Sequence, residues 1–444
     1  MLLALEGLLF ARNLHTATNY DEGVYLASLD ALRHGQTLGS EVFASQPPGF
    51  YALLRIVGAF SGYSIVAARE GFVLVAVLGC LGAYALGRAL AGPPGGLAAS
   101  ALLAILPPFP SEAMRVDADV PSASLSLVAL ALAAYGLRRR APLWLAAVAG
   151  AVLALAVSVK LFALLAAIPF AALGLRAGRR DWLAAAAGAG TVALAFVIAY
   201  AGVLGSLWDG AVQFHRDARS FPSPESSSHA LRHFLELHTP SAWLALVGAA
   251  AAVVAWRRAW PLWLWTVAVV LFLLWQKPLF DHHLVLLCAA VAAAAGVGLG
   301  RIVEIAPRRA AAPAALALAA ALAAGGAQQA HRIDLRITAE PDELVRASTR
   351  LAACPRPVAT DQPIVAFRAH RVLPGQLVDT SLVRLATPSL PPAKALRELR
   401  DARVGAVFAA RAFLHEPEIL GGLRARYGRP VRDGTTLFFG ARSC

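Results

Sequence analysis

Apolar runs recur along the chain from its first residue to about residue 330, with short polar loops between them. A helix needs roughly 20 apolar residues to cross the hydrocarbon core of a bilayer. By that measure the pattern predicts about eleven membrane-spanning helices. The runs are 1–12, 64–88, 95–110, 119–137, 142–157, 161–175, 182–204, 241–256, 260–276, 284–300 and 310–327.

Two stretches depart from a simple span. The first run contains Glu6 and is too short to cross a bilayer, so we expect the natural chain to start earlier. The stretch 142–175 is interrupted only by Ser158 and Lys160 near its middle. One helix of that length would exceed the thickness of a bilayer. The stretch therefore predicts two spans joined by a tight hairpin.

Composition agrees with lipid as the solvent. The chain is 58% hydrophobic and 15% charged, with a mean hydropathy of +0.61. Soluble domains carry roughly 25% charged residues. We therefore predict an α-helical polytopic membrane protein, with a membrane domain over 1–330 and a small C-terminal α/β domain over 331–444. The loop 13–63 is expected to carry interfacial helices, because its last part is amphipathic.

The net charge of +13 comes mainly from arginine, much of it in alternate loops. Cytoplasmic loops concentrate Lys and Arg, so this placement indicates membrane orientation and predicts no nucleic-acid partner. The arginines of these loops are Arg88, Arg138, Arg139, Arg140, Arg176, Arg179, Arg180, Arg257, Arg258, Arg301, Arg308 and Arg309. The other loops are 13–63, 111–118, 158–160, 205–240 and 277–283. We expect a bacterial plasma-membrane protein with a cytoplasmic N-terminus and an extracytoplasmic C-terminal domain.

The segment from residue 331 onward alternates short apolar stretches with amphipathic ones, which predicts a compact α/β domain. It has neither a Gly-rich phosphate loop nor a cluster of metal ligands, so a recognition or lid role is favoured over chemistry. The expected strands are 357–360, 406–409 and 436–439, and the expected helices are 391–400 and 416–427.

The four cysteines do not form a disulfide framework. Cys80 and Cys288 lie in apolar runs, where a thiol acts as a small packing residue. Cys354 and Cys444 lie near the two ends of the C-terminal domain. In an oxidising compartment they could pair and close it, and the sequence leaves paired and free thiols equally open.

Ionisable residues gather on the predicted outer face, although such groups are costly at membrane depth. Each of these residues taken alone has an ordinary structural explanation. Asp21 would begin a helix, Asp117 would cap a helix, and Lys160 would snorkel to the interface. Their convergence from five separate loops is not explained in this way, and it predicts a site at the outer interface. The residues are Asp21, Glu22, Arg69, Glu112, Arg115, Asp117, Asp119, Lys160, Asp281, His282 and His283.

Carboxylates beside cations suit an anionic substrate whose acceptor must lose a proton. The acid accepts the proton, while the cations or a metal hold a phosphate leaving group. Outside the cytoplasm, an activated group would arrive on a membrane lipid. A lipid phosphate presents its head group at the depth of these residues.

These motifs resemble the GT-C class of membrane glycosyltransferases, and most closely the branch with protein O-mannosyltransferases and lipid A aminoarabinose transferases. The similarity covers roughly residues 15–290, and the order of motifs agrees throughout. The matching positions are the acidic pair of 21–25, the Pro-Pro segment of 46–51, Ala68 and Arg69, the Asp-x-Pro step of 119–121, Lys160, and 281–284.

The resemblance implies transfer of a sugar from a polyprenyl-phosphate sugar with inversion at the anomeric carbon. It makes Asp21 the base or acceptor-orienting group, and Glu22 and Asp119 its assistants or the ligands of a divalent cation. Such a cation, Mg or Mn, would be held by Asp21 and Asp119, and metal use is left open. The donor phosphate would be held by Arg69, Lys160, His282 and His283. Supporting residues are Asp117, Arg115, Tyr25 and Gln46.

Two points stay open within this resemblance. The doublet of Asp117 and Asp119 departs from the family pattern, so either residue could match the family's aspartate. The C-terminal domain does not fix the acceptor, which could be a glycan, a lipid or a protein.

Two other functions compete with sugar transfer. A transporter would place its polar site near the bilayer midplane on broken helices or inverted repeats, whereas the polar residues lie at one end and no repeat is visible. A non-enzymatic membrane scaffold gives no reason for the polar convergence.

Overall fold

The computed structural model describes residues 1–137, 141–222 and 239–440. Arg138, Arg139, Arg140, Cys444 and part of the predicted loop 205–240 lie outside the described residues. The chain divides into two compact units. The bundle unit comprises Met1–Leu14, Arg69–Ala199 and Ser223–Arg336, and the loop–tail unit comprises His15–Ala68, Tyr200–Pro222 and Ile337–Cys444.

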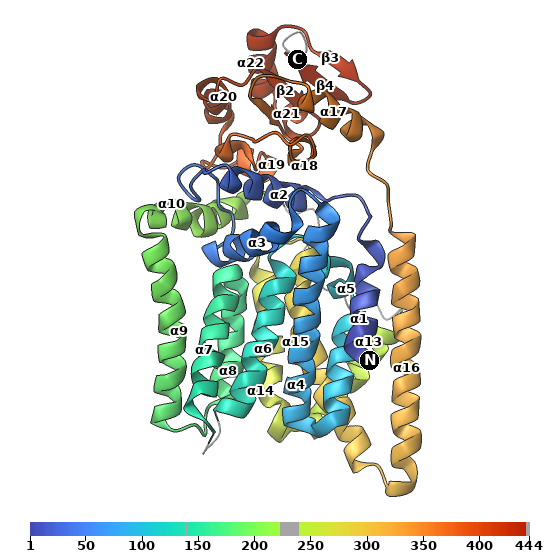
Figure 1. Cartoon of the computed structure of the whole chain (residues 1–444). Coiled ribbons are helices and arrows are strands. Elements are labelled where there is room, and N and C mark those ends of the chain that lie inside the picture. Colours follow the sequence, from blue (N-terminus) through green and yellow to red (C-terminus); the bar gives the residue numbers. More distant parts are fainter. Residues whose placement is uncertain (138–140, 223–238, 441–444) are drawn as a thin grey trace. The chain divides into compact units, whose positions relative to one another are not determined.

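The bundle unit is made of apolar helices (Figure 1). Among the described residues, six helices are long and apolar enough to cross a membrane, and three shorter apolar segments accompany them. The α-helical polytopic membrane fold is therefore confirmed. Its helices are α1 Leu2–Phe10, α4 Ile65–Ile105, α5 Phe109–Glu112, α6 Asp119–Gly136, α7 Leu143–Val159, α8 Ala167–Leu173, α9 Arg179–Ala199, α13 Pro240–Val254, α14 Trp256–Trp275, α15 Val285–Ile305 and α16 Arg308–Leu335, with short turns η1 Ala11–Asn13, η2 Leu161–Ala166 and η6 Asp281–Leu284.

Helix α4 holds two of the predicted runs, 64–88 and 95–110, on either side of a kink. The backbone leaves helical geometry at Ala91 and Gly92, and Gly92 has a φ of 69°. Glycine tolerates this positive φ because it has no Cβ, and the Pro93 that follows has no N–H for the preceding turn. The kink therefore lies where the sequence separates the two runs.

Burial separates central helices from peripheral ones within the bundle unit. The apolar window of the segment Asp281–Ile305 is 94% buried, whereas those of α9 and α16 are only 6% buried. An apolar helix exposed along its length fits lipid contact, so α9 and α16 present their side chains to the bilayer. Glycine allows helices of the bundle unit to pack closely. For example, a methyl group at Gly82 on α4 would lie only 2.8 Å from the backbone nitrogen of Val128 on α6.

The loop–tail unit combines two loops with the C-terminal domain. Helix α3 leaves Ile56 and Phe60 exposed, as an interfacial helix would. The helices are α2 Tyr20–Arg33, α3 Pro48–Ser61, α10 Leu204–Trp208, α11 Phe214–Asp217, α17 Asp342–Ala352, α18 Pro363–Arg368, α19 Leu382–Leu385, α20 Pro392–Asp401, α21 Ala412–His415 and α22 Pro417–Tyr427. Short turns are η3 Ala201–Val203, η4 Asp209–Gln213, η5 Ala218–Ser220 and η7 Gly375–Leu377.

The C-terminal domain is built on a four-stranded sheet with the order β1-β2-β4-β3. Strands β1 and β2 are parallel, and the other two pairs are antiparallel. The buried side chains of Leu399, Phe413 and Phe439 belong to its core. The small C-terminal α/β domain is thus confirmed, and its three predicted strands are present. The strands are β1 Val358–Thr360, β2 Ala406–Ala409, β3 Val431–Asp433 and β4 Thr436–Phe439.

Strand β3 was not predicted. It is three residues long, and its first two residues, Val431 and Arg432, are exposed. A short exposed strand has no apolar alternation to reveal it. The available signal was Asp433-Gly434, because Asp-Gly favours tight hairpins and Gly434 has a φ of 61°.

Candidate functional site

The candidate residues divide between the two units. Asp21, Glu22, Tyr25 and Gln46 belong to the loop–tail unit. The bundle unit holds the other candidates, which are Arg69, Arg115, Asp117, Asp119, Lys160, His282 and His283.

A buried ion pair is the central feature of the bundle unit's candidates. The Lys160 Nζ atom lies 2.7 Å from each carboxylate oxygen of Asp119, and each side chain is only 7% exposed. Lys160 follows the last residue of α7 and has an extended backbone, and Asp119 is the first residue of α6. The Lys160 ammonium is bound to a buried carboxylate, which favours an ion pair over snorkelling to the interface. Two charges buried together among apolar helices stabilise each other only as a pair.

The structure separates the roles of the two aspartates in the doublet. An Asp117 carboxylate oxygen accepts a hydrogen bond of 3.0 Å from the backbone N–H of Asp119. Asp117 therefore satisfies a free donor at the start of α6, as a capping residue does. Burial and the neighbouring Asp119 carboxylate raise the pKa of Asp117. The residue that contacts the candidate lysine is Asp119.

An aromatic ring connects Lys160 to the histidines within the bundle unit. The Lys160 Nζ atom lies 4.8 Å from the centre of the Phe162 ring, and His283 packs edge-on against that ring at 5.2 Å. His282 lies edge-on to His283 at 4.5 Å. The backbone N–H of Phe280 donates to Nδ1 of His283 over 3.3 Å, so a neutral His283 carries its proton on Nε2. Sequence reasoning did not single out Phe162, although its position two residues after Lys160 was a signal.

Arg69 is 1% exposed and donates to the carbonyl oxygen of Leu14 over 2.6 Å. Part of its hydrogen-bonding capacity therefore fixes the end of the first helical segment. Arg115 is partly buried in the loop between α5 and α6.

In the loop–tail unit, two predicted motifs meet. The Asn19 side chain accepts the backbone N–H of Glu22 at 2.8 Å and thereby begins α2. Glu22 is fully buried, whereas Asp21 is partly exposed. Gln46 donates to the Tyr25 hydroxyl at 3.1 Å, and the Tyr25 ring lies 4.6 Å from the Phe50 ring. The segments 21–25 and 46–51 are thus packed together, as adjacent parts of one site would be.

The arrangement around Asp119 does not fit a metal ion. Both of its carboxylate oxygens accept from the Lys160 ammonium, and a divalent cation would compete with that charge for the same lone pairs. Within the described parts of the chain, no group of three or more His, Cys, Asp or Glu side chains could hold a metal. The divalent cation that the sequence left open at Asp21 and Asp119 therefore gains no support from Asp119.

Similarity to known proteins agrees with the motifs. The crystal structure of ArnT from Cupriavidus metallidurans bound to undecaprenyl phosphate matches 99% of this chain and 97% of that chain, with a TM-score of 0.71 and 13% identity. This chain has the fold of a GT-C glycosyltransferase. The archaeal oligosaccharyltransferase AglB from Archaeoglobus fulgidus, in complex with an inhibitory peptide and a dolichol-phosphate, shares 13% identity and a TM-score of 0.61. That match covers 95% of this chain and 70% of the other.

The sequence itself carries a narrower similarity. Residues 45–204 match the family described as dolichyl-phosphate-mannose-protein mannosyltransferase. No curated protein sequence matches the chain. The matched range contains Gln46, Arg69, Asp119 and Lys160, so the resemblance inferred from the motifs is confirmed there by sequence and over nearly the whole chain by the GT-C fold.

Proposed function

We propose that this protein transfers a sugar from a polyprenyl-phosphate donor to an acceptor at the extracytoplasmic face of the membrane. The observation that carries the proposal is the buried pair of Lys160 and Asp119 within a GT-C fold. A buried ammonium is suited to a phosphate, because charge interactions strengthen away from water. Two proteins of similar fold support the choice of donor: ArnT was solved bound to undecaprenyl phosphate, and AglB was solved with a dolichol-phosphate.

The proposed reaction is a single displacement. The acceptor hydroxyl oxygen attacks the anomeric carbon, its proton passes to the Asp21 carboxylate, and the bond from that carbon to the phosphate oxygen breaks. The lipid phosphate leaves with the electron pair, and the configuration at the anomeric carbon inverts. Asp21 suits the base because its side chain is partly exposed, whereas the buried Glu22 suits an orienting role.

The leaving phosphate gains negative charge, which the cations are proposed to stabilise. A lysine ammonium has three N–H donors, and two of its contacts go to Asp119. The third donor is proposed for a phosphate oxygen, with Arg69 adding positive charge and the ring N–H groups of His282 and His283 adding hydrogen bonds. Asp119 then acts by orienting the ammonium rather than by taking a proton.

The test uses purified protein in lipid nanodiscs with labelled polyprenyl-phosphate mannose, arabinose, glucose or galactose, followed for transfer and for hydrolysis. Asp21→Asn should lower the rate by about 10² to 10⁴, the range of general-base contributions, with an unchanged melting temperature. Asp401→Asn is the matched control, because Asp401 is exposed at the end of α20. A wild-type rate for Asp21→Asn would remove Asp21 from the mechanism.

The sidedness of this reaction follows from the arginine-rich loops, which we place in the cytoplasm of a bacterium. The N-terminus would then be cytoplasmic and the C-terminal domain extracytoplasmic. A reporter enzyme that folds only outside the cytoplasm should be active when fused after Cys444 and inactive when fused at Arg176. The reverse result would invert the topology.

A further inference from the structure

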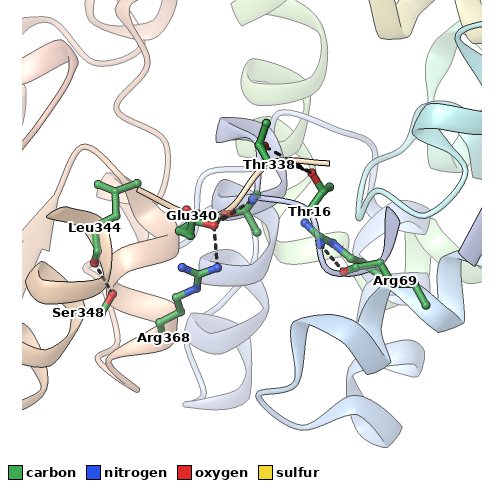
Figure 2. Close-up of polar contacts among 9 residues, drawn as sticks. Thr16, Arg69, Thr338, Glu340, Leu344, Ser348 and Arg368 are labelled. Atoms are coloured by element: carbon green, nitrogen blue, oxygen red, sulfur yellow. Dashed lines mark hydrogen bonds and ion pairs between the residues drawn. The ribbon is translucent and has the colours of Figure 1, made fainter. Parts of the chain in front are cut away.

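The segment that leads into α2 is bonded to the start of the C-terminal domain. The backbone N–H of Ala17 donates to the carbonyl of Thr338 at 2.7 Å, and the N–H of Thr338 donates to the Thr16 hydroxyl at 3.1 Å. Figure 2 shows Thr16 beside Thr338, with Glu340 two residues further along the chain. The two stretches thus run alongside each other before α2 begins.

Glu340 makes the next connection. Its carboxylate accepts the backbone N–H of Thr18 at 3.1 Å and the Thr18 hydroxyl at 3.2 Å. Arg368 of α18 donates to the same carboxylate at 2.8 Å, as Figure 2 shows. The Glu340 side chain is only 10% exposed, so these bonds are largely shielded from water.

Tyr20, the residue immediately before Asp21, makes hydrogen bonds through its hydroxyl and a cation–π contact through its ring. Its hydroxyl donates to the Asp379 carboxylate at 3.1 Å and accepts the backbone N–H of Thr380 at 2.9 Å. The Arg411 guanidinium lies 4.6 Å from the centre of the ring, at cation–π distance. All of these partners belong to the C-terminal domain.

The partners of Tyr20 are themselves fixed. Arg384 is fully buried and donates to the backbone carbonyls of Gln376 and Asp379, each at 2.6 Å. Burial lowers the pKa of Arg384 to about 10, which leaves it charged at neutral pH. Arg411 is fixed as well, because the Asp361 carboxylate accepts its backbone N–H at 2.8 Å.

Gly23 completes the contact on the far side of Asp21 and Glu22. A methyl group at this position would lie 3.0 Å from the backbone nitrogen of Ile364 in α18. The α2 helix therefore approaches the α18 backbone so closely that a side chain at Gly23 would require a shift of a few tenths of an ångström. Asp21 and Glu22 lie between two residues that the C-terminal domain holds, Tyr20 and Gly23.

We infer that the C-terminal domain is a positioning domain that sets the geometry of the Asp21–Glu22 pair, and that Tyr20 is the positioning residue through which it acts. The inference rests on the proposed function and assigns the C-terminal domain a part in it. Displacement of a reacting group by about 1 Å can cost 10²-fold in rate, so a domain that fixes the residues beside a base controls the rate without touching the substrate.

The experiment compares Tyr20→Phe with Tyr427→Phe in the full-length protein in nanodiscs. Each variant loses one tyrosine hydroxyl bonded within the loop–tail unit, and the Tyr427 hydroxyl donates to the carbonyl of Val404 at 2.8 Å. Tyr20→Phe should lower kcat about tenfold with polyprenyl-phosphate mannose, or with whichever of the four labelled donors the wild type uses, and leave KM within about twofold. Tyr427→Phe should leave both constants unchanged.

Substitutions at Asp379 test whether a conservative variant restores the rate. Asp379→Ala should reproduce the loss in kcat, whereas Asp379→Asn retains an oxygen acceptor and should recover most of the rate. The double variant Tyr20→Phe/Asp379→Ala should be about as slow as the slower single variant, because both substitutions remove the hydrogen bond between Tyr20 and Asp379. Additive losses would overturn the assigned path through Tyr20.

Hydrogen–deuterium exchange reports the contact without catalysis. Residues 18–26 should exchange faster in Tyr20→Phe than in Tyr427→Phe. Equal exchange, or equal kcat in the two variants while the wild type is active, would overturn the inference alone. A wild type inactive with all four donors would overturn the proposed function, and with it the catalytic part of the inference.

Discussion

The two units hold their candidate carboxylates in opposite ways. In the bundle unit, both carboxylate oxygens of Asp119 accept hydrogen bonds from one ammonium, that of Lys160. In the loop–tail unit, the start of α2 is held by hydroxyls, backbone amides, carboxylates and an arginine. Apolar helices have few hydrogen bonds to offer, so a charge in the bundle needs a charged partner. A polar domain can instead hold a carboxylate-bearing segment in place through several weak contacts.

This difference predicts how each unit responds when one interaction partner is removed by substitution. Removing one partner in the bundle unit leaves an uncompensated buried charge, which affects folding and function together. Removing one contact beside α2 leaves the others in place, so geometry changes while the fold survives. The variants below test that contrast from the largest expected effect to the smallest.

Lys160→Met should have the largest effect, because it leaves the Asp119 carboxylate buried without a partner. We expect about 3–5 kcal/mol of lost stability and a loss of sugar transfer. The double variant Lys160→Met/Asp119→Leu removes both charges and should recover most of the melting temperature but no activity. Thermal unfolding in detergent and donor turnover measure the two effects. A stable single variant would show that the pair is not buried in the membrane protein.

Gly188→Leu should come next, because it tests packing in the bundle unit without changing charge. A side chain at Gly188 on α9 would collide with the backbone of Ala147 on α7. Overpacking of this kind costs about 1–3 kcal/mol. Gly190→Leu is the control on the same helix, since a Cβ there meets nothing within 4 Å. Equal melting temperatures for the two variants would contradict the close pairing of α7 and α9.

Gly23→Ala should have the smallest effect on stability. Alanine gains about 1 kcal/mol of helix propensity over glycine, which offsets the tight contact with Ile364. The rate of transfer should nevertheless fall a few-fold, because α2 or α18 must shift by a few tenths of an ångström. Gly421→Ala on α22 gains the same propensity in open space and should keep the wild-type rate. A Gly23→Ala variant as fast as Gly421→Ala would show that this contact does not set the geometry.

The local pattern of apolar and polar residues was sufficient to predict most of the helices and strands. The run 119–137 became α6 Asp119–Gly136, and the predicted strand 406–409 became β2 Ala406–Ala409. Such elements follow from the length of a hydrophobic run or from a short apolar stretch, which neighbouring residues determine. Strand β3 was missed because an exposed strand of three residues has no such pattern.

The sequence by itself determined the membrane character of the chain, its order of spans and the residue types of the candidate site. Only the tertiary structure decided that Asp119, rather than Asp117, pairs with Lys160, and that the C-terminal domain holds Tyr20. The physical reason is that hydropathy is a property of neighbouring residues. A hydrogen bond between Tyr20 and Asp379 instead joins positions 359 residues apart, and it exists only after the chain between them has folded.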